Sequence, residues 1–268
     1  TMPVKVMADS YHYFEFEFEV NTDNTITITG YSGSDPNLEI PAEINRMPVT
    51  SIGEDAFLCC ESLESIVIPD SVETIGPSAF RECHSLESIT IPDSVESIGP
   101  YAFIFTALHN ITIPERITSI EDSTFAYCSS LESITIPESV TSIGDRAFAY
   151  CSSLKNITIP NSVEHIGDEV FYHCESLENV VIPESVTSIG DRVFYGCTYL
   201  TSEGTLPPFN HQNPIVRDKK LVIELILVFV IILCIILCVI LIIRKYKKAK
   251  KNDASNKNPD EKSERNPK

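Results

Sequence analysis

Positive charge is scarce over most of this chain of 268 residues. Residues 1–216 hold 7 Lys and Arg against 32 Asp and Glu, which gives a net charge of −25. A surface of that charge repels phosphate groups, so we do not expect these residues to bind nucleic acid.

The usual signatures of chemistry are also missing. The 10 glycines are scattered and form no phosphate-binding loop. The 9 cysteines form no CxxC pair and no Cys/His spacing of a zinc site. The serines lie in SS or SxxS turns and never in a G-x-S-x-G elbow, and no histidine is paired with a nucleophile. We therefore expect no catalytic residue, no metal and no cofactor.

What the chain does contain is a repeat. Phenylalanine recurs every 23 residues, with one interval of 22, and a proline recurs in step with it. A fixed period of this length is typical of a solenoid, in which each coil buries its apolar side chains only by stacking on its neighbours. The phenylalanines of this comb are Phe57, Phe80, Phe103, Phe125, Phe148, Phe171 and Phe194.

The unit at residues 131–153, LESITIPESVTSIGDRAFAYCSS, predicts the course of one coil. Its opening L-x-x-I-x-I spacing is that of a leucine-rich-repeat strand. Pro137 ends that strand because it has no amide hydrogen, and Gly144 indicates a tight turn open to a positive φ. Three apolar walls result, formed by Leu131, Ile134 and Ile136, then Val140 and Ile143, then Phe148, Cys151 and Leu154.

One coil departs from this pattern. The 22-residue interval falls there, Thr106 replaces the usual cysteine, and Glu121 replaces the usual glycine. We predict a kink or irregular turn near residues 104–109. At Glu121 the backbone is either ordinary or locally strained.

The N-terminal residues differ from the repeat. Residues 11–20 alternate apolar and polar side chains, and residues 25–29 do the same, with a turn at 21–24 between them. This pattern predicts a hairpin that covers the open end of the solenoid. We place the cap at residues 1–25 and the solenoid at 26–205.

A membrane segment follows the repeats. Residues 221–243 are apolar except for Glu224, and a helix of this length spans about 34 Å, enough for a bilayer core of about 30 Å. Residues 244–268 hold 10 Lys and Arg, so they are expected on the cytoplasmic side of the plasma membrane, with the repeats outside. Residues 206–220 form a linker, and residues 1–20 contain no apolar stretch of a signal peptide.

The repeat closely resembles the BspA-like leucine-rich repeats, also called treponemal-type. The motif LxxIxIPxxVxxIGxxAFxxCxx recurs in register over residues 26–205. The family resemblance implies a parallel β-sheet solenoid, and a surface protein of mucosal bacteria or trichomonads that adheres to host cells or matrix. A C-terminal span with a short basic tail is similar to the trichomonad members.

Six cysteines occupy one repeat position, which places neighbours about 5 Å apart in a stacked solenoid. Disulfides between coils are conceivable, but buried free thiols are favoured because Thr106 interrupts the column without ending the repeat. Cys59 falls outside this column, whose members are Cys60, Cys83, Cys128, Cys151, Cys174 and Cys197.

The outward-facing positions of the strands are the candidate binding face. They are rich in hydroxyl groups and are flanked by acidic residues that begin the strands. Asn110 and Asn156 also head N-glycosylation sequons, and glycans there would cover part of this face. The candidate partner-binding residues are Thr90, Thr112, Thr135, Thr158, Glu87 and Glu132.

Three functional hypotheses remain. The first is a non-enzymatic surface protein whose solenoid binds a protein or glycan ligand on a host cell or in matrix. The second is a signalling or endocytic receptor that recruits a partner through its tail. The third is a carbohydrate-active parallel β-helix enzyme, which would need acids and bases such as Glu121 and His109 to converge at the irregular coil.

Overall fold

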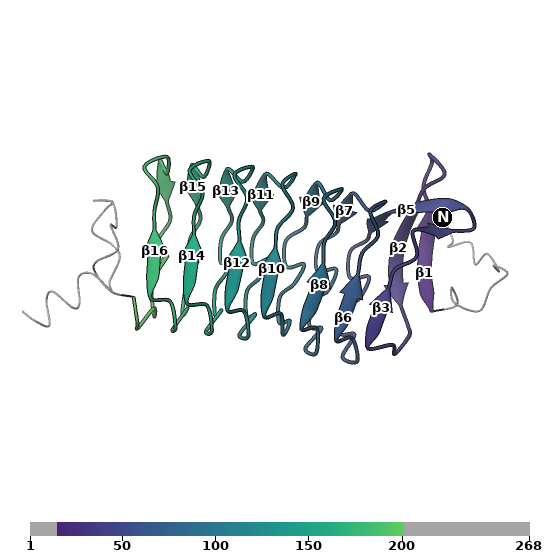
Figure 1. Ribbon diagram of the computed structural model, residues 1–268, viewed down its shortest axis with the longest axis horizontal. Coiled ribbons are helices and arrows are strands. Elements are labelled where there is room, and N and C mark those ends of the chain that lie inside the picture. The colour runs from purple at the N-terminus through teal and green to yellow at the C-terminus, as the bar shows by residue number, and fades with distance from the viewer. Residues whose placement is uncertain (1–14, 201–268) are drawn as a thin grey trace, which may run out of the picture. The chain divides into compact units, whose positions relative to one another are not determined.

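The computed structural model of the chain describes residues 15–200. In this range the chain winds into a row of coils that lie side by side (Figure 1). The predicted β-solenoid with coils of about 23 residues is confirmed. No helix within residues 15–200 is long and apolar enough to cross a membrane, and the span predicted at 221–243 lies outside the described residues.

The first wall of the solenoid is made of three-residue strands. The central side chain of each strand points inward, and its two neighbours point to solvent, as the alternation of a strand requires. Adjacent strands are parallel and in register, so Val67 lies opposite Thr90. The strands are β3 Asn37–Glu39, β6 Ser65–Val67, β8 Ser88–Thr90, β10 Asn110–Thr112, β12 Ser133–Thr135, β14 Asn156–Thr158 and β16 Asn179–Val181.

The second wall holds shorter parallel strands, on the other side of the coils from the first wall in Figure 1. Its isoleucines are aligned from coil to coil, as Ile52, Ile75 and Ile98 are. At the N-terminal end, β4 Glu43–Ile44 pairs antiparallel with β5. The strands are β5 Met47–Ile52, β7 Thr74–Ile75, β9 Ser97–Ile98, β11 Ser119–Ile120, β13 Ser142–Ile143, β15 His165–Ile166 and β17 Ser188–Ile189.

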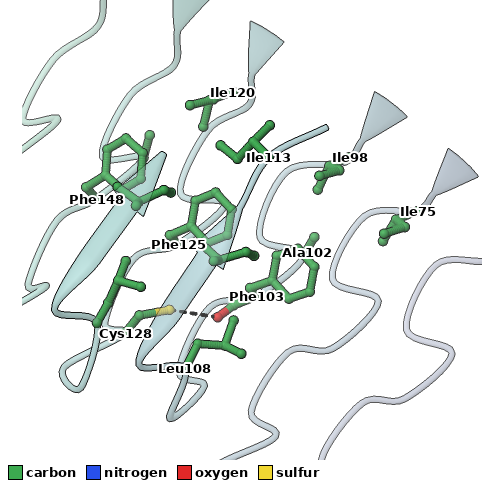
Figure 2. Close-up of a cluster of buried hydrophobic side chains, with 14 of the residues drawn as sticks. Ile75, Ile98, Ala102, Phe103, Leu108, Ile113, Ile120, Phe125, Cys128 and Phe148 are labelled. Carbon is green, nitrogen blue, oxygen red and sulfur yellow. Dashed lines mark hydrogen bonds between the residues drawn. The ribbon is translucent and has the colours of Figure 1, made fainter. Parts of the chain in front are cut away.

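The third wall carries the phenylalanine comb. All seven rings are buried and stack face to face, with centroids 5.0–5.6 Å apart and ring planes within 13° of parallel. Figure 2 shows Phe103, Phe125 and Phe148 in this stack, beside Leu108 and Cys128. Burial of large rings is a main source of core stability, and stacking adds to it. The comb is therefore the continuous core of the solenoid.

The backbone of the third wall is unusual, because φ is positive two residues before and two residues after every comb phenylalanine. Only one of these fourteen positions is a glycine, Gly196. Alternate amides bond to the next coil, as Phe57 N donates to Ala79 O at 2.8 Å. The positive-φ residues are Asp55, Cys59, Ser78, Glu82, Tyr101, Phe105, Ser123, Tyr127, Arg146, Tyr150, Glu169, His173, Arg192 and Gly196.

The glycine of the repeat has a different role from the one we predicted. The positive φ that the sequence left open at Gly144 is not found, since Gly196 alone among the described glycines has one. A Cβ on Gly144 would instead lie 2.5 Å from Asp122 Oδ1 and 2.7 Å from Asp122 N. Gly144 N donates to Ile120 O at 2.7 Å. Glycine is needed here because neighbouring coils approach too closely for any side chain.

The predicted N-terminal hairpin is present within the described residues. Strand β1, Phe16–Val20, pairs antiparallel with β2, Ile26–Tyr31, around a turn at residues 21–25. Strand β2 also pairs in parallel with β5, so the hairpin extends the second-wall sheet. Tyr31 lies 5.5 Å from Phe57 and begins the aromatic stack.

The irregular coil predicted near residues 104–109 coincides with a break in both sheets. No strand pairing joins β8 to β10, or β9 to β11, although their counterparts in most other coils are paired. Glu121 has an ordinary φ, but its Cβ occupies the place where glycine permits close approach. The third wall continues its regular hydrogen bonds across the break, for example from Phe103 N to Thr124 O at 2.9 Å. Elsewhere the two coils are joined by a bond from His109 N to Glu87 O at 3.3 Å, beside the first wall, and by an ion pair of Arg116 with Glu96 at 2.7 Å. Strand pairing is also missing between β12 and β14, in the first wall alone.

Candidate ligand-binding surfaces

The first wall displays the predicted hydroxyl-rich row. Thr90, Thr112, Thr135 and Thr158 are all exposed. Thr112 lies directly opposite Thr135, and valines continue the row at its two ends, Val181 being 57% exposed. The coils therefore place these side chains on one outer face, interrupted at the two breaks in the first-wall sheet.

The other predicted residues lie at the same wall. Glu87 and Glu132 are exposed and stand one residue before β8 and β12. The sequon residues Asn110 and Asn156 are exposed too, and Asn110 Oδ1 accepts a hydrogen bond from Ser133 Oγ at 2.6 Å. In a strand, residues i and i+2 share a face, so a glycan on Asn110 would project beside Thr112.

The third wall carries a second outer surface that sequence reasoning missed. Four successive coils place an aromatic ring two residues after the comb phenylalanine, and we name these residues the aromatic strip. The first three rings are stacked with centroids 4.4 Å apart, and the fourth lies 5.3 Å from the third. The strip consists of Phe105, Tyr127, Tyr150 and His173.

Every residue of the aromatic strip has a positive φ, between 56° and 62°. A residue with a Cβ costs about 1–2 kcal/mol in this region relative to the right-handed region, and glycine avoids the cost. Aromatic stacking returns about 0.5–1.5 kcal/mol for each pair. The rings are therefore about neutral for stability at positions where the backbone favours glycine.

An aspartate column runs along the same wall, and it begins and ends one coil later than the aromatic strip. It consists of Asp122, Asp145, Asp168 and Asp191, all exposed. The Oδ1 atoms of the first three each accept a hydrogen bond from the backbone amide of the next aspartate, at 2.7–2.8 Å. Each bonded carboxylate keeps its second oxygen, so the column presents a line of anionic acceptors.

Beside the aspartate column lies an ion triad of Arg146, Glu169 and Arg192. Glu169 is buried, with 8% of its side chain exposed, and both arginines bond to its carboxylate. The guanidinium group of Arg192 also lies 5.8 Å from the centre of the Tyr172 ring. A hollow of about 190 Å³ opens here, lined by Asp145, Arg146, Asp168, Glu169, Asp191 and Arg192.

The cysteine column is structural within the described residues, as predicted. All seven cysteines there are free, and five of the six in the column are fully buried, with Cys60 partly buried. Each buried thiol donates to the carbonyl of the comb phenylalanine one coil earlier, as Cys128 does to Phe103 O at 3.1 Å (Figure 2). Burial raises the pKa of Cys128 to about 11, so the thiol stays protonated at neutral pH.

Residues required by the enzymatic hypothesis lie on different walls. His109 is exposed at the start of the first wall, next to β10. Glu121 follows β11 on the second wall and accepts a hydrogen bond from Ser119. Among residues 15–200, no group of His, Cys, Asp and Glu side chains is arranged to hold a metal ion.

Stacked coils, a parallel first-wall sheet and exposed strand faces define a leucine-rich-repeat solenoid. The sequence matches the BspA type leucine rich repeat region in six copies, over residues 50–178 and 119–208. The chain belongs to this family.

Solved structures agree with the assignment. A leucine rich cell surface protein from Faecalibacterium prausnitzii is 35% identical over 78% of this chain, with a TM-score of 0.64. A leucine-rich repeat protein from Bacteroides ovatus is 29% identical over 74% of this chain, with a TM-score of 0.54 and 64% of its own length covered. The leucine rich repeat protein of T. pallidum is 27% identical over 76% of this chain and 92% of its own, with a TM-score of 0.51.

This chain spans 58% of the length of the Faecalibacterium protein. No curated protein matches the sequence significantly. The family model and the solved relatives therefore assign the chain to the BspA type leucine rich repeats.

Proposed function

We propose that this chain is a non-enzymatic adhesion protein that binds a protein or glycan ligand on a host cell or in matrix through its first wall. The observation that carries the proposal is the exposed row of Thr90, Thr112, Thr135 and Thr158. A regular, hydroxyl-rich face repeated along a solenoid is suited to a long ligand, because each coil adds the same contacts. The cell-surface relative from Faecalibacterium supports the same location for this chain.

The test uses cells that display the full chain and a matrix-coated surface. Replacement of Thr112 and Thr135 by arginine adds bulk and positive charge, and attachment should fall about tenfold. The matched control is Thr118→Arg with Thr141→Arg, because these are exposed threonines that directly precede the second-wall strands β11 and β13. Equal attachment by both variants would contradict binding through the first wall.

Location is proposed separately. The repeats are outside a plasma membrane crossed once by residues 221–243, and the basic tail is inside. Antibodies against the repeats should stain intact cells, and antibodies against the tail should stain only permeabilised cells. Staining of the repeats only after permeabilisation would overturn this topology.

A further inference from the structure

The third wall carries different outer residues before and after the break. Comparing the two parts shows which of these residues the fold requires. In the coils before the break, the positions of the aspartate column hold Glu54, Pro77 and Pro100, and the first two positions of the aromatic strip hold Cys59 and Glu82. The comb phenylalanines stack equally well in both versions. The aromatic strip, aspartate column and ion triad are therefore additions to a wall that forms without them.

The composition of these additions is that of a protein-binding surface. Tyrosine and arginine are enriched at the energetic centres of protein interfaces. Tyr127 of the aromatic strip is 40% exposed, and the side chains of Arg146 and Arg192 in the ion triad are 61% and 54% exposed. Tyr195, which follows the last comb phenylalanine beside the triad, is 39% exposed. Aromatic rings at positive-φ positions, where the backbone favours glycine, point to a use outside folding.

The stacking of the rings argues against a sugar as the occupant. Sugars bind aromatic residues through the faces of the rings. In the aromatic strip, the faces of Tyr127 and Tyr150 are covered by each other at a centroid distance of 4.4 Å, and Phe105 covers the other face of Tyr127 at the same distance. The partner meets ring edges instead.

The charge of the hollow indicates the charge of the partner protein. The hollow has four carboxylates, of Asp145, Asp168, Glu169 and Asp191, against two guanidinium groups, a net charge of −2. Both arginines are already bonded to Glu169, so the exposed aspartates dominate what a partner meets. A second copy of this wall would place aspartate against aspartate, which like charges disfavour. A basic partner is complementary.

We infer that the third wall from Phe105 to Tyr195 is a docking surface for an extended, lysine- or arginine-rich segment of another protein. One basic side chain enters the hollow between Asp145, Asp168 and Asp191, and others follow the free oxygens of the aspartate column. The aromatic strip packs against the aliphatic stems of these side chains. This surface is distinct from the first-wall face, so the inference does not depend on the proposed adhesion.

The test measures binding of a fluorescein-labelled peptide of alternating lysine and serine to the full chain, by fluorescence polarisation. The double change Asp145→Asn and Asp168→Asn removes two charges but keeps the oxygens that accept the backbone amides. Binding should weaken about tenfold. The matched control, Glu54→Gln with Asp55→Asn, removes two charges from the same wall before the break and should leave binding almost unchanged.

A second pair of variants tests the aromatic strip. Tyr127→Asn with Tyr150→Asn should weaken peptide binding at an unchanged melting temperature, because asparagine tolerates a positive φ. The first-wall variant Thr112→Arg with Thr135→Arg should bind the peptide normally, which separates this surface from the proposed adhesion.

Three results would overturn the inference. The first is equal weakening by the aspartate variant and its control, which would indicate attraction by the overall negative charge alone. The second is binding of maltohexaose that the tyrosine variant loses, which would indicate a glycan surface. The third is dimerisation of the full chain that the tyrosine variant abolishes, which would assign the wall to a second copy.

Discussion

The coils before and after the sheet break share one core but have different surfaces. On either side, the comb rings stack at 5.0–5.6 Å and the buried cysteines bond to the preceding coil. After the break, the third wall carries four aspartates and the ion triad in positions that hold proline, serine or other residues before it. The comparison teaches that the repeat determines the buried residues of each coil. The outer residues are not determined by the repeat and can differ between coils, which makes them available for binding.

The break also forms a weak interface between the two halves of the solenoid. Strand pairing is missing between β8 and β10 and between β9 and β11, so the halves are joined mainly by the third wall and the comb. One bond from His109 N to Glu87 O and one ion pair of Arg116 with Glu96 add to them. In a solenoid, stability is about the sum of coil stabilities and nearest-neighbour interfaces. One weak interface therefore makes the halves candidates for separate unfolding.

The largest expected effect comes from breaking the comb in one half. Phe148→Ala removes a buried ring stacked on Phe125 and Phe171 at 5.6 Å and leaves a cavity. We expect a loss of about 3–5 kcal/mol, confined to the coils after the break. Hydrogen exchange of the full chain should show faster opening of residues 109–200 than of residues 37–108.

Phe80→Ala is the matched control, and it should reverse that order. If both variants open the two halves together, the coils are coupled across the break as strongly as elsewhere, and the two-part description is wrong.

A somewhat smaller effect is expected from alkaline pH. Burial raises the pKa of Cys128 to about 11 and that of Cys197 to about 12 in the folded chain, above the ordinary value of 9. The protonated thiol is favoured by folding, so its contribution is complete below pH 9 and is lost as pH rises from 9 toward 11. For Cys128 the loss is about 3 kcal/mol.

Denaturant unfolding at pH 8 and pH 10.5 measures this loss. Cys128→Thr copies the residue found at Thr106 and should reduce the difference in unfolding free energy between the two pH values. An unchanged difference would show that other groups cause the alkaline sensitivity.

The positive-φ positions give a third contrast between the halves. Ser78→Gly should raise stability by about 1 kcal/mol, since glycine relieves the left-handed backbone at a site with no aromatic stack. Tyr150→Gly should change stability little, because it also removes stacking on Tyr127 and His173. Denaturant unfolding measures both, and Ser85→Gly, at an ordinary φ, should instead cost about 0.5–1 kcal/mol. If both glycine variants gain the same stability, aromatic stacking does not compensate the cost of the positive φ at Tyr150.

The interior of this fold could be predicted because burial imposes a period. Leu131, Ile134 and Phe148 recur at fixed intervals, since each must fit the same place in the next coil. The column of buried thiols and the position of the irregular coil followed from the same rule, as Thr106 and the 22-residue interval interrupted it.

The outer surfaces were harder to predict because their positions are under no such constraint. Tyr127, Tyr150 and His173 recur at one repeat position, so a signal was present, but their ring stacking depends on a positive φ that no motif announces. Gly144 was misread for the same reason, since glycine suggests a positive φ and the close approach of coils is visible only in three dimensions. The pairing of Glu169 with Arg146 and Arg192, 23 residues away on each side, likewise depends on the exact stacking of coils.

The smallest expected effect tests the origin of the break. Glu121→Gly removes the Cβ that keeps β11 from approaching β9 and permits a bond from residue 121 N to Ile98 O, like the 2.7 Å bond from Gly144 N to Ile120 O. The gained hydrogen bond and the entropy of glycine nearly cancel, so the unfolding free energy should change by less than about 1 kcal/mol. Amide exchange at residues 119–121 should nevertheless slow about fivefold, because these amides become paired. Glu115→Gly is the control in the same coil, and if exchange is the same in both variants, the break is caused by the residue missing near 104–109 and not by the side chain at 121.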